Sequence, residues 1–199
     1  MIEQVQLGNT ELQISKLSFG AAPLGGAYGD FTQKDADNAV RTALDLGVTT
    51  FDTSPYYGKG RSEEVLGLAL KGISRETFTV ITKCGRYDVR SFDFSAKRIM
   101  SSIDESLQRL QTDYVDLLQL HDIEFVSKEQ ILNEAMPAIE KIKASGKARF
   151  IGISGLPVRY LAVIARQVEL DTVLSWAHYN LLQDEINDEL VPLSKEKNF

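Results

Sequence analysis

The sequence predicts an α/β protein of the (β/α)8, or TIM barrel, class, and three observations support this prediction. Six apolar runs rich in β-branched residues alternate with segments of helical pattern. Residues 78–81 and 115–118 are apolar almost throughout, which is typical of parallel strands covered by helices. A doubly wound dinucleotide-binding sheet needs Gly-x-Gly-x-x-Gly directly after its first strand, and residues 20–25 (Gly-Ala-Ala-Pro-Leu-Gly) do not supply it. The barrel is therefore favoured over an open sheet.

The predicted strands follow one another at the spacing of a repeated strand–helix unit. A short hairpin comes first, because residues 5–14 alternate in polarity around Gly8-Asn9. Later strands repeat at the length of a strand, a helix and two short loops, since their central residues lie 31, 37, 33 and 24 residues apart at Thr50, Ile81, Leu118, Ile151 and Ser175. The six strands are expected at residues 17–21, 48–53, 77–83, 114–121, 149–154 and 172–179.

Helices are predicted between these strands from their periodicity and their end signals. Gly47, Gly72 and Gly146 follow three of the helical segments, and glycine commonly follows a helix end. Ser95 is a candidate N-cap, and Pro157 suits the first turn of a helix. The helices are expected at residues 33–46, 62–70, 95–111, 127–145, from 157 onward, and at 189–198.

Residues 1–199 are expected to form a single domain, because no Gly/Ser/Pro-rich linker interrupts the sequence. A barrel of this class typically has about 250 residues and eight strands, whereas the sequence predicts only six strands after the hairpin. We therefore expect a barrel truncated after about six βα units, with its C-terminal part missing and the N-terminal hairpin at one end.

Composition and charge exclude several classes of protein. The chain is 43% hydrophobic, which is ample for a core and excludes intrinsic disorder. Its 22 Lys and Arg against 28 Asp and Glu give a net charge of −6, and without a basic stripe this argues against a nucleic-acid partner. The sequence has neither a signal-peptide pattern nor an apolar run long enough to cross a bilayer, so we expect a cytoplasmic protein without a membrane partner. Cys84 is the one cysteine, which excludes an intrachain disulfide and a cysteine metal cluster. The oligomeric state is left open.

Four polar side chains stand at or just after the ends of three successive predicted strands. They are Asp52, Tyr57, Lys83 and His121. Taken singly, each has a structural interpretation: a loop-forming aspartate, a packed ring, a solvated lysine and a satisfied histidine. In a (β/α)8 barrel, however, strand ends meet in one mouth, where active sites are found. An acid, a phenol, an ammonium and an imidazole in one mouth are hard to explain by packing alone.

These four groups suit proton transfer without a metal ion. A phenol has an ordinary pKa of about 10, and a neighbouring Lys83 ammonium is expected to stabilise the phenolate of Tyr57 and lower that pKa. Asp52 is expected to hold Lys83 by a charge-assisted hydrogen bond. His121 is expected to donate a hydrogen bond to a carbonyl oxygen and orient it toward the phenol. Such a set protonates a carbonyl or deprotonates an alcohol, and a hydride donor or acceptor must complete the redox reaction.

At these residues the sequence resembles the aldo-keto reductase family. The resemblance rests on Asp52-Thr-Ser-Pro-Tyr-Tyr57-Gly58, Thr82-Lys83 and Leu120-His121, which match the family's Asp, Tyr, Lys and His tetrad, and it extends from residue 17 to residue 199. Residues 51–58, 82–87, 92–96, 121–125 and 175–179 look most like its aldose-dehydrogenase branch. The resemblance implies hydride transfer between a nicotinamide and an L-galactose- or L-fucose-type sugar at its anomeric carbon. Tyr57 would be the acid/base, tuned by Lys83 and Asp52, with His121 orienting the substrate.

The resemblance also implies residues that bind the cofactor and the substrate. The cofactor would be NAD or NADP, with NAD favoured by the aldose-dehydrogenase likeness. Its contacts are expected from Gly20, Ala21, Asp52, Ser154 and Trp176. The family carries Ser-Asn after its fifth strand and Gln in its sixth, and here Gly155 replaces the Asn and Trp176 stands near the Gln. Substrate contacts are expected from Tyr56, His121, Arg86 and Tyr87.

Two alternative functions remain open at this point. One is a truncated, non-catalytic barrel that acts as a binding module, and the other is an NADPH-dependent aldehyde or ketone reductase. His178, in the sixth predicted strand, could contact a substrate or fill space. Cys84 follows Lys83, so strand alternation predicts that it points to the opposite face as a buried, inert thiol.

Overall fold

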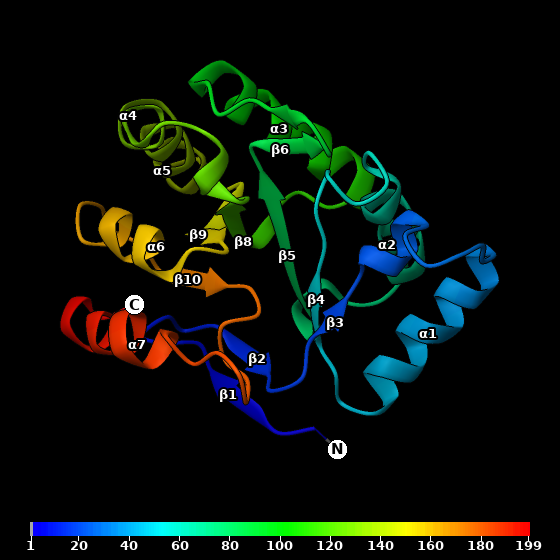
Figure 1. Cartoon of the computed structure of the whole chain (residues 1–199). Coiled ribbons are helices and arrows are strands. Elements are labelled where there is room, and N and C mark those ends of the chain that lie inside the picture. Colours follow the sequence, from blue (N-terminus) through cyan, green and yellow to red (C-terminus); the bar gives the residue numbers. More distant parts are fainter. Residues whose placement is uncertain (1) are drawn as a thin grey trace.

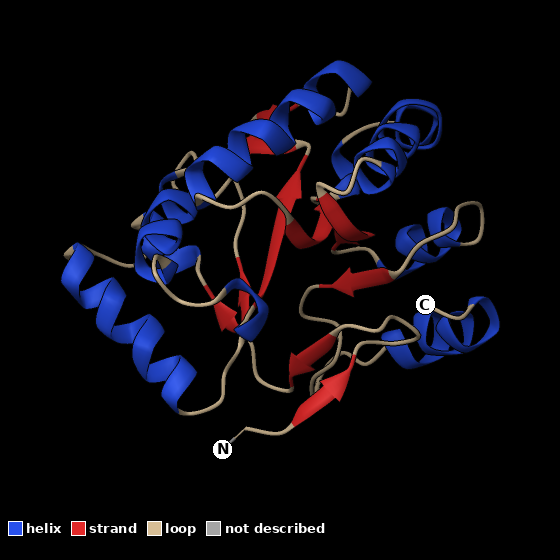
Figure 2. Ribbon diagram, turned by 180° about the vertical axis from the view of Figure 1, so that it is seen from behind, coloured by secondary structure: helices blue, strands red, loops and turns tan. Residues whose placement is uncertain are grey.

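The computed structural model describes residues 2–199 and has six parallel strands in one curled sheet, with helices covering its outer face (Figures 1 and 2). The strand order is β3-β4-β5-β8-β9-β10, so each strand pairs with the next barrel strand along the chain. β3 and β10 form the two edges of this sheet. The α/β class, the parallel strand–helix order and the six βα units predicted from the sequence are confirmed.

The observed elements match most of the predicted ones closely. The sheet strands are β3 (Phe19–Gly20), β4 (Thr50–Asp52), β5 (Thr79–Cys84), β8 (Val115–Leu120), β9 (Ala148–Gly155) and β10 (Thr172–Ser175). The α-helices are α1 (Gln33–Asp45), α2 (Arg61–Leu70), α3 (Ala96–Leu110), α4 (Lys128–Gln130), α5 (Met136–Ala144), α6 (Val158–Ala165) and α7 (Ile186–Lys197). Short 3-10 turns lie at η1 (Ala22–Gly25), η2 (Arg75–Thr77) and η3 (Ile123–Phe125).

Three local features differ from the prediction. The helix expected at 127–145 divides into α4, a π-helical turn η4 (Ile131–Ala135) and α5. Pro137, which cannot donate a backbone hydrogen bond, lies in the first turn of α5 directly after this turn. β10 ends at Ser175, four residues before the predicted end. The loop after β5 forms its own antiparallel pair, β6 (Arg86–Asp88) and β7 (Ser91–Phe92), which the apolar periodicity does not indicate because the strands are so short.

The predicted N-terminal hairpin is present as β1 (Gln4–Gln6) and β2 (Gln13–Ser15), with Val5 opposite Ile14. It lies beside α7, and the Asn9 side-chain amide donates to the Asn198 carbonyl (3.0 Å; Figure 1). At its other end, Ser15 Oγ accepts from the backbone amides of Thr49 and Thr50, which lead into β4. The hairpin therefore ties the N-terminal end of β4 to the last helix.

The core lies between the sheet and the helices that cover it. Its largest fully buried side chains include Phe51, Phe94, Ile99, Leu118 and Ile139, which come from strands, loops and helices along much of the chain. Helix α3 follows the predicted cap, because Ser95 Oγ accepts from the Arg98 amide (3.3 Å). No helix within residues 2–199 combines the length and the apolar character needed to cross a membrane.

One buried carboxylate joins α2 and α3 to the back of the sheet. Glu63 is fully buried, accepts from Thr82 Oγ1 (2.5 Å) and forms an ion pair with Arg109 Nε (2.6 Å). Burial raises the pKa of Glu63, and Arg109 and Thr82 partly offset this rise. A buried carboxylate of this kind depends on its cation, because removal of one partner leaves an uncompensated charge.

The Glu63–Arg109 pair therefore predicts a large stability effect. Arg109→Met should lower the free energy of unfolding by about 3 kcal/mol, since Glu63 would lose its cation while remaining buried. Lys147→Met is the matched control, because it removes an exposed ion pair with Asp104, which lies on α3 as Arg109 does. We expect this variant to lose less than about 1 kcal/mol of unfolding free energy. Urea denaturation measures both. Equal losses in the two variants would contradict this account of Glu63.

Candidate active site

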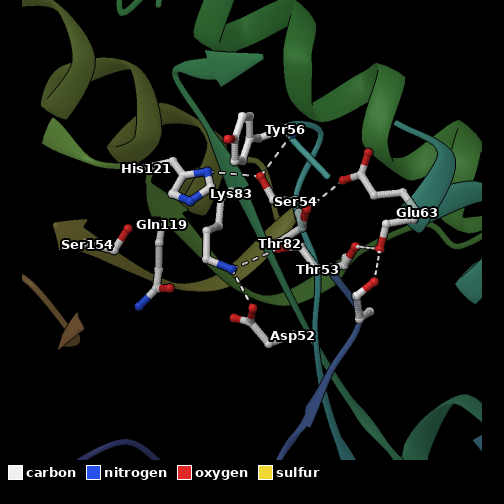
Figure 3. A network of polar contacts seen from close by, with 12 residues as sticks. Asp52, Thr53, Ser54, Tyr56, Glu63, Thr82, Lys83, Gln119, His121 and Ser154 are labelled. Atoms are coloured by element: carbon white, nitrogen blue, oxygen red, sulfur yellow. Dashed lines mark hydrogen bonds and ion pairs between the residues drawn. The ribbon is translucent and has the colours of Figure 1, made fainter. Parts of the chain in front are cut away.

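The four predicted catalytic side chains meet at the carboxyl ends of β4, β5 and β8. Asp52 is the last residue of β4, Lys83 is the fifth residue of β5, and His121 directly follows β8. The parallel register pairs Asp52 with Ile81 and Lys83 with Gln119, so each site residue lies two positions further along its strand than the partner of the one before it. Figure 3 shows Asp52, Lys83 and His121 on the inner face of the curled sheet. Tyr57 joins them from the loop after β4, with its ring centroid 5.8 Å from that of His121.

The Lys83 ammonium is the centre of this group. Its Nζ donates to Asp52 Oδ1 (2.5 Å) and to the Thr53 carbonyl (2.9 Å; Figure 3). It also lies 5.2 Å from the centroid of the Tyr57 ring. Lys83 is 2% exposed. Burial lowers the pKa of Lys83, but the neighbouring Asp52 and Tyr57 outweigh burial, so this pKa lies above its ordinary value. The lysine is therefore a fixed cation, and the expected Asp52–Lys83 contact is present.

Burial has the opposite effect on the phenol. Desolvation raises the pKa of Tyr57, the Lys83 charge lowers it and the Asp52 charge raises it again. The resulting pKa lies above the ordinary value of a phenol. The prediction that Lys83 lowers this pKa has the right sign for that one interaction. It is wrong for the final pKa of Tyr57, because the sequence does not reveal how strongly the ring is desolvated.

His121 is almost fully buried and neutral near neutral pH. Desolvation lowers its pKa well below 6.5, and the charges of Lys83 and Arg86 lower it further. Its Nδ1 is 2.9 Å from Ser54 Oγ, and its ring lies edge-on to Tyr56 with 5.7 Å between centroids. A neutral imidazole in this position can donate one hydrogen bond and accept another.

The loop that carries Tyr57 is held by a close contact between two backbone segments. Residues 54–57 form a turn with Pro55 inside it, closed by a hydrogen bond from the Tyr57 amide to the Ser54 carbonyl (3.0 Å). Gly25, at the end of η1, packs directly on this turn, since a Cβ there would lie 2.6 Å from the Tyr57 carbonyl carbon. Gly58 has a φ of +66° and faces Gly25 from the other side. These two glycines therefore set the path of the turn that carries the phenol, a role that the motifs containing them do not reveal from sequence alone.

Comparison with known proteins places this arrangement in a family. The model of the Aldo/keto reductase family matches residues 16–199. The chain belongs to the aldo/keto reductase family. It is 49% identical to the L-galactose dehydrogenase of Arabidopsis thaliana, over 98% of the chain and 62% of that relative. It is 33% identical to a D-threo-aldose 1-dehydrogenase of a Pseudomonas species, over 93% of the chain and 63% of the relative.

A solved structure of the family shares the fold over the entire chain. An aldo-keto reductase of Bacillus halodurans, in its holo form, superposes with a TM-score of 0.83 at 28% identity and covers 100% of this chain and 64% of its own length. The chain therefore spans less than two thirds of the length of the aldo/keto reductases that it matches.

The structure offers unsatisfied oxygen atoms that suit the family's nicotinamide cofactors. In the described part of the chain, the buried oxygens Asp52 Oδ2 and Gln119 Oε1 have no hydrogen-bond partner. Figure 3 shows both side chains on the inner face of the sheet, with Ser154 beside Gln119. Such oxygens accept hydrogen bonds from hydroxyl and amide groups, which a nicotinamide riboside carries. The residues present therefore fit this class of cofactor.

The other residues expected to bind the cofactor occupy varied environments. Gly20 is paired with Asp52 in the sheet, and the Ala21 amide donates to the Asp52 carbonyl (2.8 Å). Ser154 Oγ lies within weak hydrogen-bond distance of the Leu120 carbonyl (3.3 Å) and the Asp122 amide (3.4 Å). Trp176 follows β10 and is 64% exposed. Gly155, where the family carries Asn, leaves room for Glu124, whose Oε2 would lie 2.5 Å from a Cβ there.

The residues expected to contact substrate divide into two environments. Arg86 pairs with Asp122 and stacks on Tyr56, with 3.9 Å from its Cζ to the ring centroid, so it borders the site. Tyr87 instead packs against α3: Arg98 lies 4.1 Å from its ring centroid, and its hydroxyl accepts from the Gly85 amide. Burial raises the pKa of Tyr87 to about 12. The ring of Tyr87 and its hydroxyl group are thus both engaged by other residues. Tyr87 differs from Arg86 in this way because successive residues of a strand, here β6, point to opposite sides.

The two weaker candidates take structural positions. Cys84 is buried against the Gln119 carbonyl, and burial raises the pKa of its thiol, so it is the inert thiol that strand alternation predicts. His178 lies beyond the end of β10, where the sequence predicts a strand, and its Nδ1 is 3.1 Å from Glu185 Oε2.

The Gly25 contact predicts that a single methyl group displaces the phenol. Gly25→Ala should lower kcat about 10²-fold, because the turn must move away from the new Cβ and a shift of about 1 Å at a reacting group has that effect. Gly72→Ala is the control: its φ of +79° makes alanine strained, by about 1 kcal/mol, but no atom lies within 4 Å of the new Cβ. Both variants should unfold at lower temperature, and only Gly25→Ala should lose activity. Full activity in Gly25→Ala would contradict the positioning role.

Proposed function

We propose that the chain carries the catalytic tetrad of an NAD(P)-dependent aldose 1-dehydrogenase, which oxidises an L-galactose- or L-fucose-type sugar to its lactone. The observation that supports this most is the Lys83 ammonium, which contacts Asp52 and lies beside the Tyr57 ring. The identity of 49% with an L-galactose dehydrogenase supports the sugar class, and that with a D-threo-aldose 1-dehydrogenase supports oxidation at carbon 1.

In this proposal each residue has one chemical task. NAD, favoured over NADP, supplies the hydride acceptor when it is bound. Tyr57 as phenolate takes the proton of the anomeric hydroxyl, and Lys83 stabilises the negative charge on the phenolate. Asp52 keeps Lys83 charged and in place, and His121 donates a hydrogen bond to the oxygen that becomes the carbonyl. Gly20, Ala21, Asp52, Ser154 and Trp176 border the proposed cofactor, and Tyr56 and Arg86 border the sugar.

The direct test is an assay of the native polypeptide with two pairs of reactants: a sugar with NAD, and an aldehyde with NADPH. We expect NADH to form with L-galactose or L-fucose and NAD. An NADPH-dependent reductase, the second candidate, would instead consume NADPH with simple aldehydes and show negligible sugar oxidation. The chain is also 28% identical to an NADH-specific methylglyoxal reductase of Escherichia coli, which supports testing the reductive direction, with NADH as well as NADPH.

Tyr57→Phe separates catalysis from mere binding. The substitution removes the ionisable proton with little change of shape, so kcat/KM should fall about 10²–10⁴-fold, the usual contribution of a general base. Cofactor binding, followed by the quenching of protein fluorescence, should change little. A variant that retained activity within about tenfold would exclude Tyr57 as the acid/base.

The raised pKa of Tyr57 predicts the pH dependence of sugar oxidation. The reaction needs the phenolate, whose fraction grows until the pH passes the pKa, so kcat/KM should rise with pH to above about 10. Because burial keeps His121 neutral, no break should occur near its ordinary pKa of 6.5. Initial rates across the pH range measure this. A plateau that begins below neutral pH would contradict the assignment of the base.

A further inference from the structure

We propose that Ser54 is a positioning residue that holds His121 in the tautomer with its proton on Nε2. The tautomer follows from the hydrogen bonds of the protein itself. Its use as a donor to the substrate oxygen rests on the proposed function.

Ser54 lies between the imidazole of His121 and the backbone of Tyr56. Its Oγ lies 2.9 Å from His121 Nδ1 and 3.1 Å from the Tyr56 amide nitrogen (Figure 3). Ser54 is fully buried and His121 is 5% exposed, so water does not compete for these groups. The Tyr56 N–H can only donate, which means that Ser54 Oγ accepts from it. Within residues 2–199, Ser54 Oγ has these two hydrogen-bond neighbours.

The hydroxyl proton of Ser54 needs an acceptor inside this buried site. If His121 carried its proton on Nδ1, Ser54 Oγ would accept twice, and its own O–H would have no acceptor inside a buried site. Buried donors without a partner are rare because they are costly. The arrangement that satisfies every group has the Tyr56 N–H donating to Ser54 Oγ and the Ser54 O–H donating to Nδ1. Nδ1 is then an acceptor, and the proton of the neutral ring is on Nε2.

The other side of the imidazole supports the same assignment. Nε2 lies 3.6 Å from Asp122 Oδ2, and this carboxylate is paired with Arg86. An unprotonated Nε2 would place a lone pair opposite a carboxylate oxygen, whereas an Nε2–H presents a positive edge to it. The aromatic neighbours Tyr56 and Tyr57 lie edge-on to the imidazole ring. Within residues 2–199, neither of them accepts a hydrogen bond from this ring.

The first experiment reads the tautomer directly and needs no catalysis. The protein is labelled with 15N-histidine, and long-range 15N–1H correlation spectra are recorded near neutral pH. A His178→Gln variant removes the signals of the other histidine in this sequence. We expect a pyridine-type Nδ1 and a pyrrole-type Nε2 for His121. The reverse pattern, a pyrrole-type Nδ1, would overturn the proposal.

The second experiment tests whether Ser54 is the cause. Ser54→Ala should populate the Nδ1–H form, so the two nitrogen signals should move toward each other, and kcat/KM for sugar oxidation should fall about tenfold. Ser101→Ala, on the exposed face of α3, is the control and should leave both spectrum and rate unchanged. If the His121 signals of Ser54→Ala match those of the unsubstituted protein, Asp122 alone selects the tautomer and the proposal fails. If the tautomer responds as expected but no sugar is oxidised, the proposed function fails and the role of Ser54 stands.

Discussion

The burial of the Lys83 ammonium is the constraint on which the site depends. A cation that is 2% exposed needs partners that compensate for the water it has lost, and it has the carboxylate of Asp52 and the carbonyl of Thr53. Both partners come from the end of β4, so the ammonium links the ends of β4 and β5. The turn that follows Thr53 then brings the ring of Tyr57 beside the same cation. One buried charge thus has Asp52, Thr53 and Tyr57 gathered around it.

The charge of Lys83 and the burial of the site set the protonation states of their neighbours together. Burial favours the neutral forms of Tyr57 and His121, while Lys83 favours the anion of the first and opposes the cation of the second. The site at rest therefore holds a neutral phenol, a neutral imidazole and the Asp52–Lys83 ion pair. This state is suited to proton exchange, because the phenol can change its charge beside a cation that does not change its own.

The sequence predicts the strand order and the tetrad because both follow from local patterns. Apolar runs locate β4, β5 and β8, and a polar residue at the end of a parallel strand has a known place in the barrel mouth. What it does not predict depends on contacts between distant segments. Gly25 meets Gly58, Glu63 meets Arg109, and Ser54 meets His121 only once the chain has folded. The packing of the Tyr87 side chain against α3 also depends on the folded structure. The final pKa of Tyr57 depends on burial, which a motif cannot quantify.

The most direct test of this account replaces Lys83 by methionine, which keeps the length of the side chain and removes its charge. If the ammonium stabilises the phenolate, the pKa of Tyr57 must rise further in Lys83→Met. The pH profile of kcat/KM should then move to higher pH, and the rate at neutral pH should fall. A profile at the same pH as that of the unsubstituted protein, with any change confined to KM, would contradict the central role given to Lys83.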